Sequence, residues 1–267
     1  MLQNLKAYVR PESLEQAWKT FMDNSARALF VSGGVSTALR EDERTEILID
    51  IQKLLPDSVM ETEQSFEIGG GMRITEVIDD MDKHPITQVL KTVGTNQIRN
   101  MSTISGSIAQ KYGWSDVVTL FLALKSSLRV YDGDERVISL EDYLHGNQKP
   151  IILSVIFDSR FNFGAFQHMT RTDYDVSQLN FYLCAEIAEG IVKNAGAAYG
   201  ARPGLAVRFE ELEGALTGKS VDELCRGAED YSKLSEMAKV SDGLDLSAEY
   251  RRELLGVFIR RSLKQLT

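Results

Sequence analysis

The stretch NQIRNMSTISGSIA occupies residues 96–109, and it is rich in hydroxyl groups but carries little charge. Thr103, Ser105 and Ser107 offer hydroxyl donors, and Gly106 allows close approach to the backbone because it has no Cβ. Taken alone, the pattern is compatible with two interpretations, a solvated surface loop and a loop that holds an anionic ligand.

A second segment of the same kind lies nearer the N-terminus. The apolar run Ala26–Val31 predicts a buried strand, and it ends at FVSGGVST, residues 30–37. Two glycines followed by hydroxyl residues expose several backbone N–H groups together, which suits a phosphate. A plain turn at the end of a strand is the alternative. The run Gly69–Gly71 has neither the GxGxxG nor the GxxxxGK[ST] spacing, so we interpret it as a structural connection.

One carboxylate stands out beside these segments. Asp116 opens the stretch DVVTLFLALK, residues 116–125, which is apolar nearly all round and predicts a buried helix. The carboxylate can cap that helix, or it can accept hydrogen bonds from the hydroxyls of a sugar or ribityl chain. Both interpretations remain open on the residues alone.

The periodicity along the chain predicts an α+β protein. Residues 13–24 have helical spacing, and 47–51 and 150–157 are apolar strands. Antiparallel strands are expected after about residue 158, and helices follow Arg208. The change in character places a boundary near 158–162.

Composition excludes several functions. The formal net charge of −9 and the pI near 5.0 argue against a nucleic-acid partner. Cys184 and Cys225 are too few for an iron–sulfur cluster or a zinc site, and we expect them to be reduced thiols. No stretch is long and apolar enough to insert in a membrane, and no secretion signal is evident, so we expect a cytoplasmic protein. No catalytic residue and no metal ligand set stand out, which suits a chain whose chemistry resides in a bound cofactor.

A family resemblance ties these segments together. NQIRNMSTISGSIA resembles the IRNxxTIGGNIA signature of the FAD-binding subunits of molybdenum hydroxylases, the xanthine dehydrogenase and carbon monoxide dehydrogenase type. FVSGGVSTALR, residues 30–40, is similar to that family's LAGGTDLxxxMR. YVRPESLEQA at 8–17, RTDYDV at 171–176 and DLSAEYRR at 245–252 look like three further family segments in the same order.

The resemblance implies an architecture. It implies a two-subdomain α/β FAD-binding domain of the PCMH type over residues 1–160, split near 54–57. A C-terminal domain with a three-stranded antiparallel sheet and helices then covers residues 161–267. It also implies an electron-transfer subunit, which passes electrons from the [2Fe–2S] clusters of one partner chain, beside a molybdopterin subunit, through FAD to NAD or another acceptor. A subunit without FAD that serves only as a scaffold, and a stand-alone flavin oxidoreductase, are the alternatives.

The resemblance also assigns the cofactor site. The predicted FAD-binding residues are Phe30, Val31, Ser32, Gly33, Gly34, Val35, Ser36, Thr37, Thr103, Ile104, Ser105, Gly106, Ser107, Asp116, Ile152 and Gln167. The chain departs from the family pattern within this set. Ser105 and Ser107 replace a glycine and an asparagine, Val35 and Ser36 replace Thr-Asp, and Gln167 replaces a lysine. Hydroxyls preserve hydrogen bonding at 36, 105 and 107, whereas the positive charge at 167 is lost.

Overall fold

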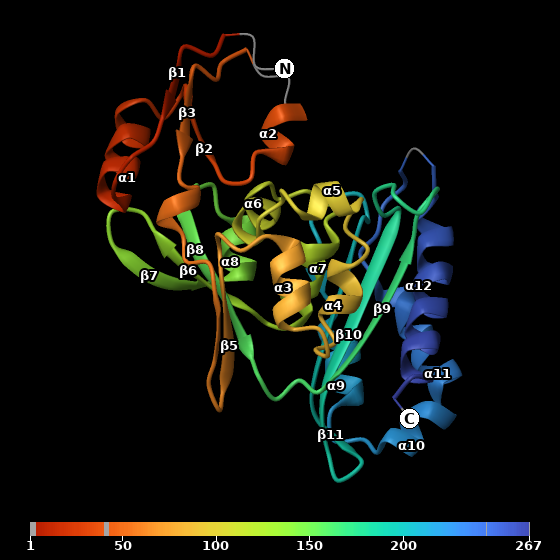
Figure 1. The fold of residues 1–267 in the computed structure, drawn as a ribbon. Helices are drawn as coiled ribbons and strands as arrows, with labels where there is room; N and C mark the ends of the chain where they lie inside the picture. The colour runs from red at the N-terminus through yellow and green to blue at the C-terminus, as the bar shows by residue number, and fades with distance from the viewer. Residues whose placement is uncertain (1–3, 40–42, 244, 267) are drawn as a thin grey trace.

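The computed structural model describes residues 4–39, 43–243 and 245–266. Its strands form sheets of three, five and four strands in this part of the chain. Figure 1 shows the first sheet at one end of the molecule and the last helix, α12 (Ala248–Leu263), along the strands of the third sheet. The chain is therefore α+β, with a helical layer on the C-terminal sheet. No helix within the described ranges has the length and apolar character needed to cross a bilayer.

The first sheet is parallel, and its strands in spatial order are β1 (Ala7–Val9), β3 (Ile47–Asp50) and β2 (Ala28–Val31). Helix α1 (Leu14–Asp23) begins after Ser13, whose hydroxyl accepts a hydrogen bond from the Gln16 amide. Phe21 of α1 stacks on Phe30 of β2 with 4.6 Å between the ring centroids. This aromatic contact attaches the helix to the sheet. After β2 the chain forms the short helix α2 (Val35–Leu39) and, after β3, the 3₁₀ turn η1 (Gln52–Leu54).

The second sheet is antiparallel, and its strands in spatial order are β4 (Val59–Glu61), β5 (Ser65–Gly69), β8 (Ile151–Asp158), β6 (Ser127–Tyr131) and β7 (Glu135–Ser139). The helices inserted between its strands are α3 (Ile74–Asp80), α4 (Thr87–Leu90), α5 (Asn96–Arg99), α6 (Ile104–Ala109), α7 (Asp116–Ala123) and α8 (Leu140–His145). The segment 96–109 is thus two short helices joined by a turn, and the expectation of a loop there is wrong. Thr95 and Thr103 cap the two helices with their hydroxyl oxygens.

Helix α7 lies in the middle of the molecule. Every residue from Val117 to Ala123 is buried, as the all-round apolar pattern predicts. Its core includes Val155 and Phe157 of the second sheet as well as Tyr182 and Cys184 from the C-terminal half. One hydrophobic core therefore joins the two halves of the chain.

The third sheet is antiparallel and has four strands rather than the predicted three. In spatial order they are β12 (Val207–Arg208), β11 (Ile191–Gly200), β10 (Leu179–Ala188) and β9 (Phe163–Met169). The additional strand β12 is only two residues long, too short for a periodic pattern to reveal it. The helices that follow are α9 (Glu210–Leu216), α10 (Val221–Arg226), α11 (Ala228–Ser232), the 3₁₀ turn η2 (Lys233–Met237) and α12.

The packing of α7 on the third sheet leads to a stability prediction. A Cβ added at Gly196 of β11 would lie 2.0 Å from the carbonyl oxygen of Ala123 at the end of α7. We expect Gly196→Ala to lower the free energy of unfolding by about 1–3 kcal/mol, because the helix must move off the sheet. Gly214→Ala, inside α9, is the matched control, since nothing lies within 4 Å of its added Cβ. The control should stabilise the protein by about 0.5–1 kcal/mol. Denaturant unfolding measures both, and equal effects would contradict the proposed packing.

Candidate cofactor cavity

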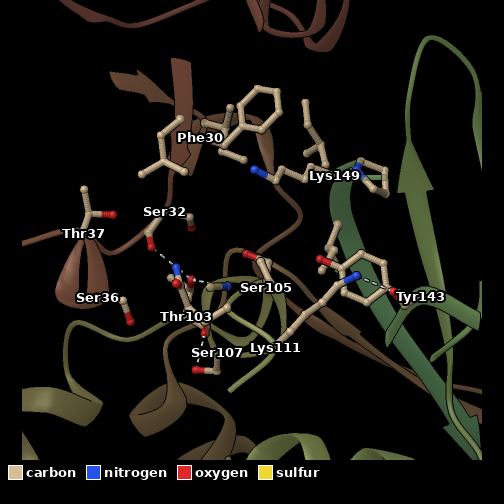
Figure 2. A pocket seen from close by; sticks show the side chains of 18 of the residues that line it. Phe30, Ser32, Ser36, Thr37, Thr103, Ser105, Ser107, Lys111, Tyr143 and Lys149 are labelled. Atoms are coloured by element: carbon tan, nitrogen blue, oxygen red, sulfur yellow. Dashed lines mark hydrogen bonds between the residues drawn. The ribbon is translucent and has the colours of Figure 1, made fainter. Parts of the chain in front are cut away.

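A cavity of about 660 Å³ opens between the first sheet, helix α6 and the start of β8. Its volume is in the range of small-molecule sites. Both sequence segments contribute to its wall, and Figure 2 shows Ser32, Ser36 and Thr37 beside Thr103, Ser105 and Ser107. The remaining described lining residues are Phe21, Leu29 and Ile51, residues 110–112, and residues 143 and 146–152.

The two segments contact each other directly. The Thr103 hydroxyl is 3.4 Å from the carbonyl oxygen of Ser32. Gly33 has a φ of +75°, and a Cβ there would lie 2.2 Å from the carbonyl oxygen of Met101. Only glycine satisfies both conditions at this position. The ends of β2 and α6 are therefore held together by backbone contact.

The two segments offer different groups to a ligand. The amides of Gly33 to Ser36 donate to no acceptor in the described part of the chain, as expected ahead of and within the first turn of a helix. The amides of Ile104 and Ser105 instead donate to the carbonyl oxygens of Met72 and Gly70, each at 3.0 Å. The first segment therefore presents free N–H groups, whereas the second presents mainly side-chain hydroxyls.

Ser105 places a polar atom with unused hydrogen-bonding capacity at the cavity wall. Its side-chain oxygen is buried there and has no hydrogen-bond partner among the described residues. The Gly106 amide donates to Thr103 Oγ1 at 3.1 Å, and the Ser107 hydroxyl donates to the Thr103 carbonyl oxygen at 2.8 Å. Because buried polar groups are normally satisfied, an unpaired hydroxyl at a cavity wall fits a ligand that offers it a hydrogen-bond partner.

The charge of the cavity is opposite to that of the protein. Among the described residues that line it, the charged ones are Lys111 and Lys149 and none is acidic, although the net charge of the chain is −9. Lys111 Nζ donates to the carbonyl oxygens of Tyr143 and Gly146, at 2.6 and 2.7 Å, and lies 4.3 Å from the centre of the Tyr143 ring. Burial and the neighbouring charge of Lys149 lower the pKa of Lys111. Such a wall favours an anion.

Comparison with protein families identifies the ligand class. The protein-family model described as "FAD binding domain in molybdopterin dehydrogenase" matches residues 3–157. A second family model, "CO dehydrogenase flavoprotein C-terminal domain", matches residues 164–266. The chain belongs to the FAD-binding flavoproteins of the molybdenum hydroxylases. The resemblance inferred from the sequence segments is confirmed, and the chain is an oxidoreductase subunit of the carbon monoxide and xanthine dehydrogenase type.

Individual relatives are distant. The glyceraldehyde dehydrogenase medium chain of Sulfolobus acidocaldarius is 23% identical, and the match covers 97% of this chain and 98% of the relative. A carbon monoxide dehydrogenase of Hydrogenophaga pseudoflava superposes with a TM-score of 0.87 at 19% identity, covering 98% of this chain and 97% of that one. The quinoline 2-oxidoreductase of Pseudomonas putida 86 gives 0.86 at 18% identity, covering 100% and 98%. At these identities the solved structures support the fold alone.

The cavity gathers most of the residues that the sequence assigned to this flavoprotein's cofactor. Those that line it are Phe30, Ser32, Gly34, Val35, Ser36, Thr37, Thr103, Ser105, Gly106, Ser107 and Ile152. Val31 and Gly33 line a second cavity of about 580 Å³, to which Gly34 and Thr37 also contribute. Ile104 is fully buried in the core, and neither Asp116 nor Gln167, on β9, lines either cavity.

Asp116 lies instead where the two halves of the chain meet. The cap of α7 is Ser115, whose hydroxyl accepts from the Val118 amide, so Asp116 does not provide the side-chain cap. Its carboxylate accepts hydrogen bonds from the Ser177 hydroxyl at 2.7 Å and from Asn180 Nδ2 at 2.5 Å. Burial raises the pKa of Asp116, while these two hydrogen bonds favour its charged form.

Several cavity residues were not predicted from the sequence. Lys111, Tyr112, Tyr143 and Lys149 belong to no motif that we recognised, and 143–149 are distant in sequence from both segments. Lys111 follows the second segment closely, and its φ of +48° is unusual for a side-chain-bearing residue. No sequence pattern signals either feature.

The geometry of α6 gives a prediction for flavin binding. A Cβ at Gly106 would lie 2.9 Å from Thr103 Oγ1 and 3.2 Å from the carbonyl oxygen of Ser32, between the two segments. We expect Gly106→Val to weaken FAD binding at least about ten-fold, because the valine must push the segments apart or fill the cavity. Flavin content per folded chain is the measurement, with circular dichroism as the check on folding. Gly214→Val is the matched control, and full flavin occupancy in Gly106→Val would show that α6 does not line the cofactor site.

Proposed function

We propose that this chain is the flavin subunit of a molybdenum hydroxylase complex. In that complex it would pass electrons from the iron–sulfur clusters of a partner chain to the final electron acceptor. A partner chain would hold [2Fe–2S] clusters and another the molybdopterin, and NAD or another small molecule would be the acceptor. The observation that carries the proposal is the cavity lined by both segments, whose described lining residues include two lysines and no acidic residue. When bound, FAD supplies the redox chemistry, and the residues of the chain hold and orient it.

Different residues would offer FAD backbone amides, side-chain hydroxyls and apolar surface. Gly33 to Ser36 would donate backbone N–H groups to a phosphate, and the hydroxyls of Ser36, Thr37 and Ser105 would add side-chain donors. The Ser107 hydroxyl already donates to the Thr103 carbonyl oxygen, so it could only accept a hydrogen bond from the ligand. Ile152 and Phe30 offer apolar surface at the wall. Ile104 acts indirectly, because its burial fixes the start of α6.

Asp116 and Gln167 would serve a more distant part of the cofactor. Asp116 lies at the N-terminus of α7 and contacts residues 177 and 180 of the C-terminal half, and Gln167 pairs with Phe181 in the third sheet. We propose that these two polar side chains contact the portion of FAD that extends past the cavity toward this sheet. A carboxylate suits hydroxyl donors, whereas a neutral amide leaves the redox group without the positive charge that a lysine would supply.

One observation favours the scaffold alternative. The amides of Ile104 and Ser105 are already bonded to carbonyl oxygens of the chain, so α6 stands complete without a ligand. The unsatisfied Ser105 hydroxyl and the two lysines favour cofactor binding instead. The absorption spectrum of the purified chain separates the two, since flavin bands exclude a scaffold without FAD.

The proposal predicts that the chain is catalytically incomplete alone. Loaded with FAD, it should pass electrons from NADH to an artificial dye if NAD is the acceptor, but it should not hydroxylate a purine, an aldehyde or a heterocycle. Co-purification from the native host, followed by assay of the complex and of the separated chain, tests this. Hydroxylation by the lone chain at the rate of the complex, or a native preparation without iron–sulfur and molybdenum chains, would contradict it.

A further inference from the structure

We propose that Lys111 and Lys149 form a phosphate-binding pair that recognises the diphosphate of the cofactor, in place of the free amides that α6 does not offer. The proposal rests on the proposed function, because it takes FAD as the ligand of this cavity. It adds two side chains, from two connections far apart in the sequence, to the site predicted from the sequence segments.

Among the described residues, the cavity has no carboxylate to neutralise its lysines. None of the described lining residues is acidic, and neither lysine forms an ion pair within the described part of the chain. Other basic side chains have carboxylate partners, for example Arg129 with Glu67 at 2.9 Å and Arg208 with Glu213 at 2.5 Å. The protein has 39 acidic and 30 basic residues, so it has more than enough carboxylates to pair with every lysine and arginine. Two neighbouring unpaired cations at one cavity are therefore suited to an anion from outside the chain.

Contacts within the chain hold Lys111 in place before a ligand binds. Its ammonium group has three donors, and the carbonyl oxygens of Tyr143 and Gly146 accept two of them. The Tyr143 ring lies under the same group at 4.3 Å. One donor remains, so Lys111 offers a fixed point charge with little side-chain entropy left to lose.

Lys149 is exposed and lies just before Pro150 and β8. Figure 2 shows its side chain reaching across the cavity toward Phe30, on the side opposite Ser107. The two lysines therefore approach the cavity from different elements, while the hydroxyls of the first and second segments face it from the other side. A diphosphate has enough acceptor oxygens to engage both groups at once.

Lys149→Gln is the main test, because Lys149 is exposed and its side chain makes no hydrogen bond within the described part of the chain. Titration of the full-length chain with FAD, followed by flavin fluorescence, should show binding about ten-fold weaker in this variant. Binding of riboflavin, which has no phosphate, should be unchanged, and Lys149→Arg should restore most of the FAD affinity. Wild-type affinity for FAD should fall between about 50 mM and 500 mM salt, and it should fall less steeply in Lys149→Gln.

Two further variants make the test specific. Lys53→Gln removes one positive charge from an exposed lysine outside both cavities, and it should leave FAD affinity unchanged. Lys111→Met keeps the length of the side chain and should also weaken FAD binding. Thermal unfolding checks that the loss of its hydrogen bonds to Tyr143 and Gly146 leaves the end of α8 folded. If Lys149→Gln and Lys111→Met both bind FAD within two-fold of wild type, the phosphate assignment is wrong while the proposed function stands.

ADP distinguishes the two proposals. If the wild-type chain binds ADP in a lysine-dependent manner but binds no FAD, the phosphate pair is supported and the flavin function is wrong. If the wild-type chain binds neither ADP nor FAD, both proposals are wrong. An equal loss of riboflavin and FAD affinity in Lys149→Gln would also overturn the phosphate assignment, since the lysine would then act on the flavin or on the fold.

Discussion

The burial of α7 between two sheets is the constraint on which the rest of the structure depends. Its apolar residues have no solvent-facing side, so they need the second sheet on one side and β10 and β11 on the other. The small residue Gly196 lets the sheet approach the end of the helix, and Asn180 links to Asp116 at its start. The C-terminal half is thereby fastened to the FAD-binding half through apolar packing and a buried polar contact, rather than through a flexible linker.

The same packing positions the cavity. The connection from α6 to α7 carries Lys111 and Tyr112, so fixing α7 also fixes one wall of the site. The other wall depends on the turn after β5, where the carbonyl oxygen of Gly70 accepts from Ser105 and the Gly70 amide donates to Leu153 at 2.6 Å. The glycine run that sequence reasoning assigned to structure therefore supports the cofactor segment from behind. A site organised in this way does not depend on the ligand to order its backbone.

The parts of this fold that sequence predicts are those with a local signal. The spacing of Phe21 and its neighbours predicts α1, and the unbroken apolar run predicts β8. The two-residue strand β12 is set only by pairing with β11, so it has no signature of its own. The replacement of glycine by Ser105 was visible in the sequence, but the orphaned hydroxyl and the occupied amides follow from tertiary contacts. Lys111 and Lys149 are far apart in sequence and come to the same cavity only in the folded chain, which is why motif reasoning missed them.

The sign of the charge has a kinetic consequence for cofactor binding. The chain carries −9 overall, so its long-range field opposes the approach of an anionic dinucleotide, while the two lysines attract it only at short range. Tight binding of FAD would then depend on slow dissociation rather than on fast association. The hydroxyls, the free amides and the partly buried ammonium group of Lys111 would act at short range, and they would contribute mainly to slow dissociation. That balance suits a cofactor that is loaded once and retained through many turnovers, and it does not suit a substrate exchanged in each cycle.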